Sequence, residues 1–139
     1  MTDTAEAPVQ TVEVKGGVAP YIMLENASGV ADFYKKALAA EEHGPRHAME
    51  DGRLMHCHLY VNGGSVMLMD PMPEYGHPAV PPAAISLHLQ VDDADAWFER
   101  AVAAGCTVTM PVDVQFWGDR YGAVKDPFGV DWSFGSTPK

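Results

Sequence analysis

Two histidines at strand spacing are the first residues in this sequence whose types suggest chemistry. His56 and His58 flank Cys57 in a run whose pattern favours a β-strand. Side chains two residues apart on a strand project from one face, about 7 Å apart, so both imidazoles can ligate one divalent ion. Alternatively, they are hydrogen-bonded or partly exposed strand residues, because no fixed-spacing metal motif surrounds them. The spacing leaves both interpretations open.

The densest polar and aromatic cluster lies in the second half of the chain. It comprises Phe116 and the run Trp117-Gly118-Asp119-Arg120-Tyr121-Gly122. Arg120 can fix a carboxylate or phosphonate by two parallel hydrogen bonds, while Phe116 and Trp117 cover an apolar part of the ligand. Tyr121 is counted with these ligand-binding residues. In the alternative interpretation the glycines flank a hairpin, Asp119 pairs with Arg120 or across a dimer, and the rings are core.

Two helices with start and stop signals must position these side chains. The first is expected to begin at Asn26 or Ser28, and the second at Asp92 or Asp93, because these side chains can cap free amides. Gly105 can end the second helix. The stripes expected to face a sheet are Val30, Phe33, Tyr34 and Ala37 in the first helix, and Ala94, Trp97, Phe98 and Ala101 in the second.

The two helices belong to an internal repeat. Residues 33–40 and 97–104 match in type position by position, at an offset of 64 (97 minus 33). A strand-like run precedes each helix, over 20–24 and 85–91, and further strand-like segments follow it. These segments span 54–61 and 65–69 in the first half, and 107–112, 121–125 and 130–134 in the second. Each half is therefore predicted to be a β-α-β-β-β unit.

The repeat defines one domain with a short tail. Residues 1–16 are interpreted as a flexible N-terminal tail, and residues 17–139 as a single domain. Module one spans about 18–70 and module two about 84–136. The segment of about 71–83 between them is rich in proline and is expected to be a linker.

Composition and charge exclude several classes of function. Nineteen acidic and nine basic residues among 139 give a net charge of −10, so we expect neither a nucleic-acid nor a membrane partner. No apolar run reaches the length of a membrane helix, and the N-terminus lacks the features of a secretory signal, so a cytoplasmic location is expected. Motifs of nucleotide-binding enzymes and serine hydrolases are absent.

Three short motifs and the repeat together resemble a known family. The motifs are Phe33-Tyr34, the run 117–122, and Asp126-Pro127-Phe128-Gly129 before the last strand. The chain resembles the glyoxalase / bleomycin-resistance / extradiol-dioxygenase superfamily, also called vicinal oxygen chelate, and within it the PhnB-like branch. The resemblance covers about residues 18–136. It implies an α+β fold in which two tandem βαβββ modules form a curved mixed sheet around a cleft, and it implies a homodimer.

The resemblance also implies four positions for a metal, on the first and last strand of each module. They fall at or beside Tyr21, Leu68, Ser86 and Ser133. Leucine and neutral hydroxyls cannot replace the imidazole, carboxylate or thiolate that divalent metals require. We therefore expect no metal at the usual site and no cofactor, and assign these four residues to ligand binding.

A rebuilt metal site is the alternative. His88 lies two residues after Ser86, and Asp70 lies two residues after Leu68, so each shares the strand face of its neighbour. With His56 and His58 they can hold one divalent ion. Without metal, His88 and Arg120 are the candidate catalytic residues, because imidazole titrates near neutral pH.

Three functions follow. The first is the binding of a small organic molecule in a metal-free cleft. The second is an enzyme of the same superfamily, a lyase, isomerase, dioxygenase or thiol transferase, that depends on a metal or on histidine. The third is a vestigial cleft that serves only as a scaffold or for dimerisation.

Overall fold

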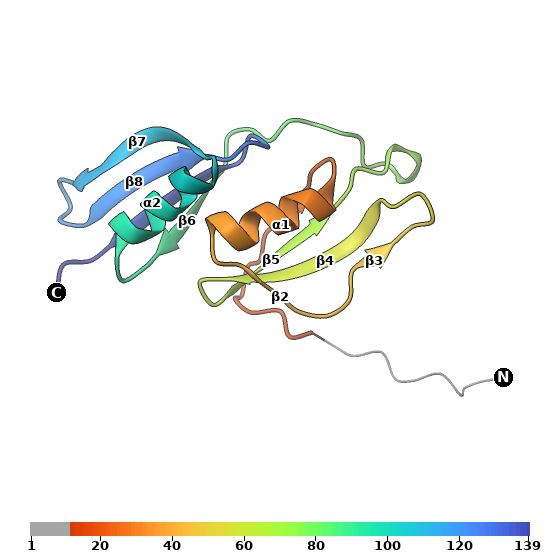
Figure 1. Cartoon of the computed structure of the whole chain (residues 1–139), viewed down its shortest axis with the longest axis horizontal. Coiled ribbons are helices and arrows are strands. Elements are labelled where there is room, and N and C mark those ends of the chain that lie inside the picture. Colours follow the sequence, from red (N-terminus) through yellow and green to blue (C-terminus); the bar gives the residue numbers. More distant parts are fainter. Residues whose placement is uncertain (1–11) are drawn as a thin grey trace.

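Each half of the repeat forms one sheet with one helix (Figure 1). The computed structural model describes residues 12–139, so most of the predicted tail, 1–16, lies outside it. The first module contains β1 (Tyr21–Met23), α1 (Ala27–Ala37), β2 (Glu41–Glu42), β3 (His47–Ala48), β4 (Leu54–Val61) and β5 (Gly64–Met69). The second contains β6 (Ser86–Gln90), α2 (Ala94–Ala104), β7 (Thr107–Val114), β8 (Arg120–Lys125) and β9 (Asp131–Ser136). The predicted α+β fold of two tandem modules is confirmed.

The two sheets have equivalent strand orders, because in each the first strand of the module pairs with its last strand. The first is ordered β1-β5-β4-β2, with β3 also paired to β4, and the second is ordered β6-β9-β8-β7. β1 is parallel to β5 and β6 is parallel to β9, while the remaining pairs are antiparallel. No strand pairing joins the sheets within the described residues, so β1 and β6 are edge strands. The linker that joins β5 to β6 contains one 3-10 turn, Pro73–Tyr75.

Side-chain caps fix where the helices begin. Asn26 caps α1 by accepting a hydrogen bond from the amide of Gly29, and Asp93 caps α2 by accepting one from Ala96. Gly105 follows α2 with φ at 126°, a left-handed value that favours glycine. Of the alternative starts, Asn26 and Asp93 are therefore the ones the chain uses.

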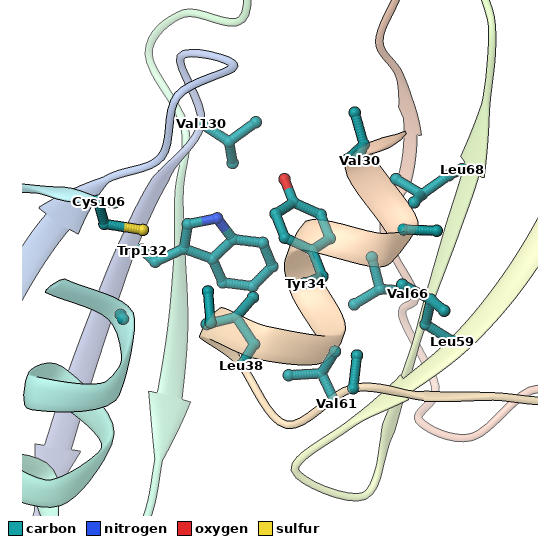
Figure 2. Packing of buried hydrophobic residues seen from close by; sticks show 14 of the residues in the cluster. Val30, Tyr34, Leu38, Leu59, Val61, Val66, Leu68, Cys106, Val130 and Trp132 are labelled. Atoms are coloured by element: carbon teal, nitrogen blue, oxygen red, sulfur yellow. The ribbon is translucent and has the colours of Figure 1, made fainter. Parts of the chain in front are cut away.

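One hydrophobic core runs through both modules (Figure 2). The ring of Tyr34, on α1, meets the indole of Trp132, on β9, edge to face with centroids 5.3 Å apart. Leu38 and Cys106 extend this contact from the two sides. The helices also contact each other. The modules are therefore packed together through their helix sides rather than through their sheet edges.

A buried carboxylate joins the modules at the centre of this core. The Tyr34 hydroxyl donates to Oδ2 of Asp126 at 2.6 Å, and the Trp132 indole nitrogen donates to the same oxygen at 2.9 Å. Oδ1 of Asp126 accepts from the amides of Phe128 and Val130. The Asp126–Gly129 motif thus forms the expected turn and also connects α1 to β9.

Each helix covers one face of its sheet and leaves the other face without a helix. On β6, Leu87 and Leu89 belong to the covered side, whereas Ser86, His88 and Gln90 alternate to the other. We call the uncovered surfaces the first and the second open face. The first open face includes Tyr21, His56, His58, Tyr60 and Met67; the second includes Ser86, His88, Met110, Asp113, Tyr121 and Ser133.

Candidate functional site

An apolar cleft lies between the edge strands β1 and β6, beneath the linker. Its volume is about 480 Å³. Tyr21 and Met23 line it from β1, Leu87 lines it from β6, and Val80 and Pro82 line it from the linker. Volumes of this size are common among sites for small organic molecules. Both modules therefore contribute to one apolar hollow.

The first open face carries a row of rings. The Tyr21 hydroxyl lies 2.8 Å from Nδ1 of His56, and the rings of His56 and His58 are 6.2 Å apart. Tyr60 continues the row 5.0 Å from His58. Burial, followed by the charge of neighbouring imidazoles, lowers the pKa of both histidines. They are therefore neutral, hydrogen-bonded groups at pH 7.

His88 is held by hydrogen bonds on both ring nitrogens. The Gln90 amide nitrogen donates to Asp119 and Thr137, so its oxygen, 2.8 Å from Nε2 of His88, is the acceptor. Nε2 therefore carries the proton, and Nδ1 accepts from the Ser133 hydroxyl at 2.8 Å. A proton transfer between His88 and a ligand would have to break one of these two bonds.

His88 is also the end of a row of rings on the second open face. It stacks on Tyr121 with centroids 5.8 Å apart and planes at 15°. Trp117 lies 5.7 Å from Tyr121, and Phe116 lies 4.8 Å from Trp117. Trp117 is 51% exposed and Phe116 is 97% exposed. We call Phe116, Trp117, Tyr121 and His88 the ring ladder.

Arg120 makes its two-pronged contact inside the chain. Its Nε and one terminal nitrogen donate to the two carboxylate oxygens of Asp95, on α2, at 2.7 and 2.9 Å. The guanidinium that was expected to hold a ligand carboxylate is therefore engaged with a helix. Asp119, expected to pair with Arg120 or across a dimer, accepts from Gln90 instead.

The prediction that Leu68 lines the ligand site is wrong. Leu68 pairs with Ile22 and Cys57, is fully buried, and lies in the core on the side of α1. Met67 takes the place on the first open face, in register with Tyr21. The assumed strand phase was off by one residue, which exchanges the two faces of a strand.

Asp70 connects three elements of the first module. Its Oδ1 accepts from the amides of Asn26 and Ala27 at 2.8 and 3.3 Å, and its Oδ2 accepts from the amide of Leu54 at 2.7 Å. Both oxygens thus hold the starts of α1 and β4 against the end of β5. A metal would have to displace these backbone donors.

The alternative set of metal ligands is not assembled within one chain. His56 and His58 lie on the first open face, and His58 places Nε2 2.7 Å from the Ser65 hydroxyl. His88 lies in the other sheet, bonded as described above. Across residues 12–139, no group of three or more histidine, cysteine, aspartate or glutamate side chains is arranged to hold an ion. The four residues of the alternative metal site are therefore not brought together in the described part of the chain.

Sequence reasoning missed two residues that shape the second open face. Gln90 orients His88, and its position two residues further along the same strand was a usable signal. Gly135 lies beneath the imidazole, where an added Cβ would come within 2.8 Å of Cε1 of His88. Nothing in the sequence alone indicated that close approach.

A comparison with models of protein families identifies the family of this chain. The model described as "Glyoxalase/Bleomycin resistance protein/Dioxygenase superfamily" matches residues 22–134. The chain belongs to this superfamily. An uncharacterized protein of Mycobacterium bovis is 42% identical over 130 residues, which cover 89% of this chain and 85% of the relative.

Solved structures agree with membership of the glyoxalase/bleomycin resistance protein/dioxygenase superfamily. A Pseudomonas aeruginosa protein has a TM-score of 0.70 and 26% identity, covering 90% of this chain and 100% of that one. A Bacillus cereus protein described as a putative 3-demethylubiquinone-9 3-methyltransferase, PhnB protein, has a TM-score of 0.65 and 21% identity, covering 88% and 100%. The second likeness establishes the shared fold only. No helix in residues 12–139 has the length and apolar character to cross a membrane.

Proposed function

We propose that this chain binds a small organic molecule against the open faces of its sheets, without the superfamily's usual metal site. One observation carries the proposal: a helix covers one face of each sheet, and the other face carries a row of rings. A helix-free sheet face lined with aromatic groups suits an organic ligand, because rings offer large apolar contact area with few rotatable bonds.

The apolar cleft supports the same proposal. Tyr21 belongs both to the first open face and to the lining of the cleft, so the hollow of about 480 Å³ and the row of rings meet at this residue. Met23 lines it, and Met67 lies beside Tyr21 in the sheet. Methionine side chains adapt to irregular apolar shapes. We also propose a cytoplasmic location and, on account of the net charge of −10, neither nucleic acid nor membrane as partner.

We also propose that the protein forms a homodimer and that it belongs to the PhnB-like branch of the superfamily. Large apolar side chains are exposed on the sheets; among them Tyr21 is 48%, Met55 52% and Met110 43% exposed. A second copy would cover part of this surface, and two-fold pairs are the commonest assemblies of soluble chains. Sedimentation is expected to give twice the 15.0 kDa mass of the chain. A monomer at micromolar concentration would overturn this part.

A thermal-shift screen tests ligand binding. A library of neutral, cationic and anionic organic molecules is expected to contain compounds that raise the melting temperature, because a ligand that binds the folded state stabilises it. Tyr21→Ala or Trp117→Ala should abolish the shifts. Tyr75→Ala is the matched control, because Tyr75 is 64% exposed in the linker turn. A library without stabilising compounds, or compounds indifferent to both open-face changes, would overturn the proposal.

Metal analysis tests the metal-free part separately. Protein prepared without a histidine tag should contain less than stoichiometric metal, and nickel, zinc, manganese and iron(II) should leave its melting temperature unchanged. Stoichiometric metal with a matching rise in melting temperature would instead favour the metal-dependent enzyme.

A further inference from the structure

We infer that the second open face selects flat aromatic molecules that are neutral or positively charged, and disfavours anions of the same shape. This inference rests on the proposed function and names the ligand class of the same site. It is carried by the arrangement of the ring ladder and by the charges around it.

The outer rings of the ring ladder, Phe116 and Trp117, offer exposed faces on which a flat ligand can stack. The four rings of the ring ladder run from the β7–β8 connection to β6, each within 5.8 Å of the next. Trp117 and Phe116, at its outer end, are 51% and 97% exposed. Exposed rings of this size lose little conformational freedom when a flat ligand packs against them, and their faces are electron-rich.

The inner end of the ring ladder is fixed before any ligand binds. Ser133 and Gln90 hold the two nitrogens of His88, and the imidazole lies nearly parallel to Tyr121. Gly135 leaves the space that the imidazole occupies. A surface that is already ordered gives tighter binding, because fewer side chains must be immobilised.

The charges beside the ring ladder favour cations. Asp113 is in register with Tyr121 on the neighbouring strand, and Asp119 lies within hydrogen-bond distance of Gln90. The basic residues of β8 are both engaged with carboxylates, Arg120 with Asp95 and Lys125 with Asp131 at 3.0 Å. The ring faces and the two nearby carboxylates therefore attract positive charge and repel negative charge.

Three probes of similar size test the inference. 1-Methylquinolinium is a cation, 2-naphthol is neutral and 2-naphthoate is an anion, and each has two fused six-membered rings. Calorimetric titration at low salt should show binding of the first two, with 2-naphthoate at least about tenfold weaker than 1-methylquinolinium. Equal or tighter binding of 2-naphthoate would overturn the inference.

Variants locate the binding and the selectivity. Phe116→Ala and Trp117→Ala should each weaken the binding of 1-methylquinolinium about fivefold or more, and the control Tyr75→Ala should not change this affinity. Replacing both Asp113 and Asp119 by asparagine should reduce the ratio of the affinities for 1-methylquinolinium and 2-naphthoate about fivefold. Glu99→Gln, which removes one negative charge at an exposed site on α2, should leave the preference unchanged.

The outcomes separate this inference from the proposed function. Library compounds that depend on Tyr21 but are indifferent to Phe116 and Trp117 would overturn the inference and leave the proposed function standing. No binding of any probe or library compound would overturn both. Ring-ladder variants that change sedimentation but not probe binding would assign the rings to a contact between copies and would also overturn the inference.

Discussion

At the scale of single residues, the buried carboxylate of Asp126 shows how one side chain holds two modules together. It is 4% exposed and accepts from the Tyr34 hydroxyl, the Trp132 indole and the amides of Phe128 and Val130. Groups buried in this way are stable only while their hydrogen bonds are complete. The hydroxyl is the one donor that comes from the other module.

Tyr34→Phe removes that donor and keeps the ring. We expect the free energy of unfolding to fall by about 2 kcal/mol, because a hydrogen bond to a buried charged acceptor is lost. Urea unfolding followed by circular dichroism measures the change. Tyr75→Phe, at an exposed tyrosine, should stay within about 0.5 kcal/mol of the parent protein. Equal stability of the two variants would contradict the role assigned to Asp126.

The histidines of the first open face predict a dependence of stability on pH. Because the folded protein lowers the pKa of His58 below its ordinary value of 6.5, the unfolded chain binds more protons in the interval between the two values. Stability is therefore expected to fall as the pH drops from 7.5 to 5.5. In His58→Gln, the same decrease in pH should cost less stability. Unfolding measured at both pH values tests this, and equal slopes in the two proteins would contradict it.

At the scale of elements, Asp70 is the side chain that sets β5 against α1 and β4. Asp70→Asn keeps the size of the group but replaces one acceptor oxygen by a donor, which cannot accept from the backbone amides it faces. We expect a loss of about 2 kcal/mol in unfolding free energy. Glu25→Gln, at an exposed position between β1 and α1, should change little. An Asp70→Asn variant of normal stability but altered metal content would instead support a role of Asp70 as a metal ligand.

The elements that sequence could predict are those with local signals. The helix starts at Asn26 and Asp93 and the end at Gly105 were all legible, because capping needs only residues nearby in sequence. The family resemblance assigned Leu68 to the wrong strand face, and the sequence could not correct this, because Val66, Met67 and Met69 are also apolar and β5 shows no alternation of apolar and polar residues. β2 and β3 are two residues each and leave no pattern.

The site was predictable only in part for a related reason. Strand periodicity placed His88 on the same strand face as Ser86, whereas Tyr21 was assigned from the family resemblance and Tyr121 from its polar and aromatic cluster. The partner of Arg120 was not predictable, because Asp95 lies 25 residues away and meets it only once α2 packs on β8. Hydrogen bonds between distant elements are decided by the packing of the whole domain.

At the scale of the whole molecule, the continuous core makes the two modules one cooperative unit. Tyr34 and Leu38 of the first module pack with Trp132 of the second, so neither half can keep its buried side chains without the other. All three tryptophans, at positions 97, 117 and 132, lie in the second module. Their fluorescence therefore reports that module, while far-ultraviolet circular dichroism reports both.

Leu38→Ala tests this coupling from the far side of the interface. Leu38 is 1% exposed and belongs to the first module, and truncating a buried leucine costs about 2–5 kcal/mol. In a single cooperative unit, the urea midpoints by fluorescence and by circular dichroism should coincide and fall together, at one fixed protein concentration. Val80→Ala, at a position 67% exposed, serves as the control. A fluorescence midpoint that stays in place while the dichroism transition splits would mean that the modules unfold independently, and that the shared core does not couple them.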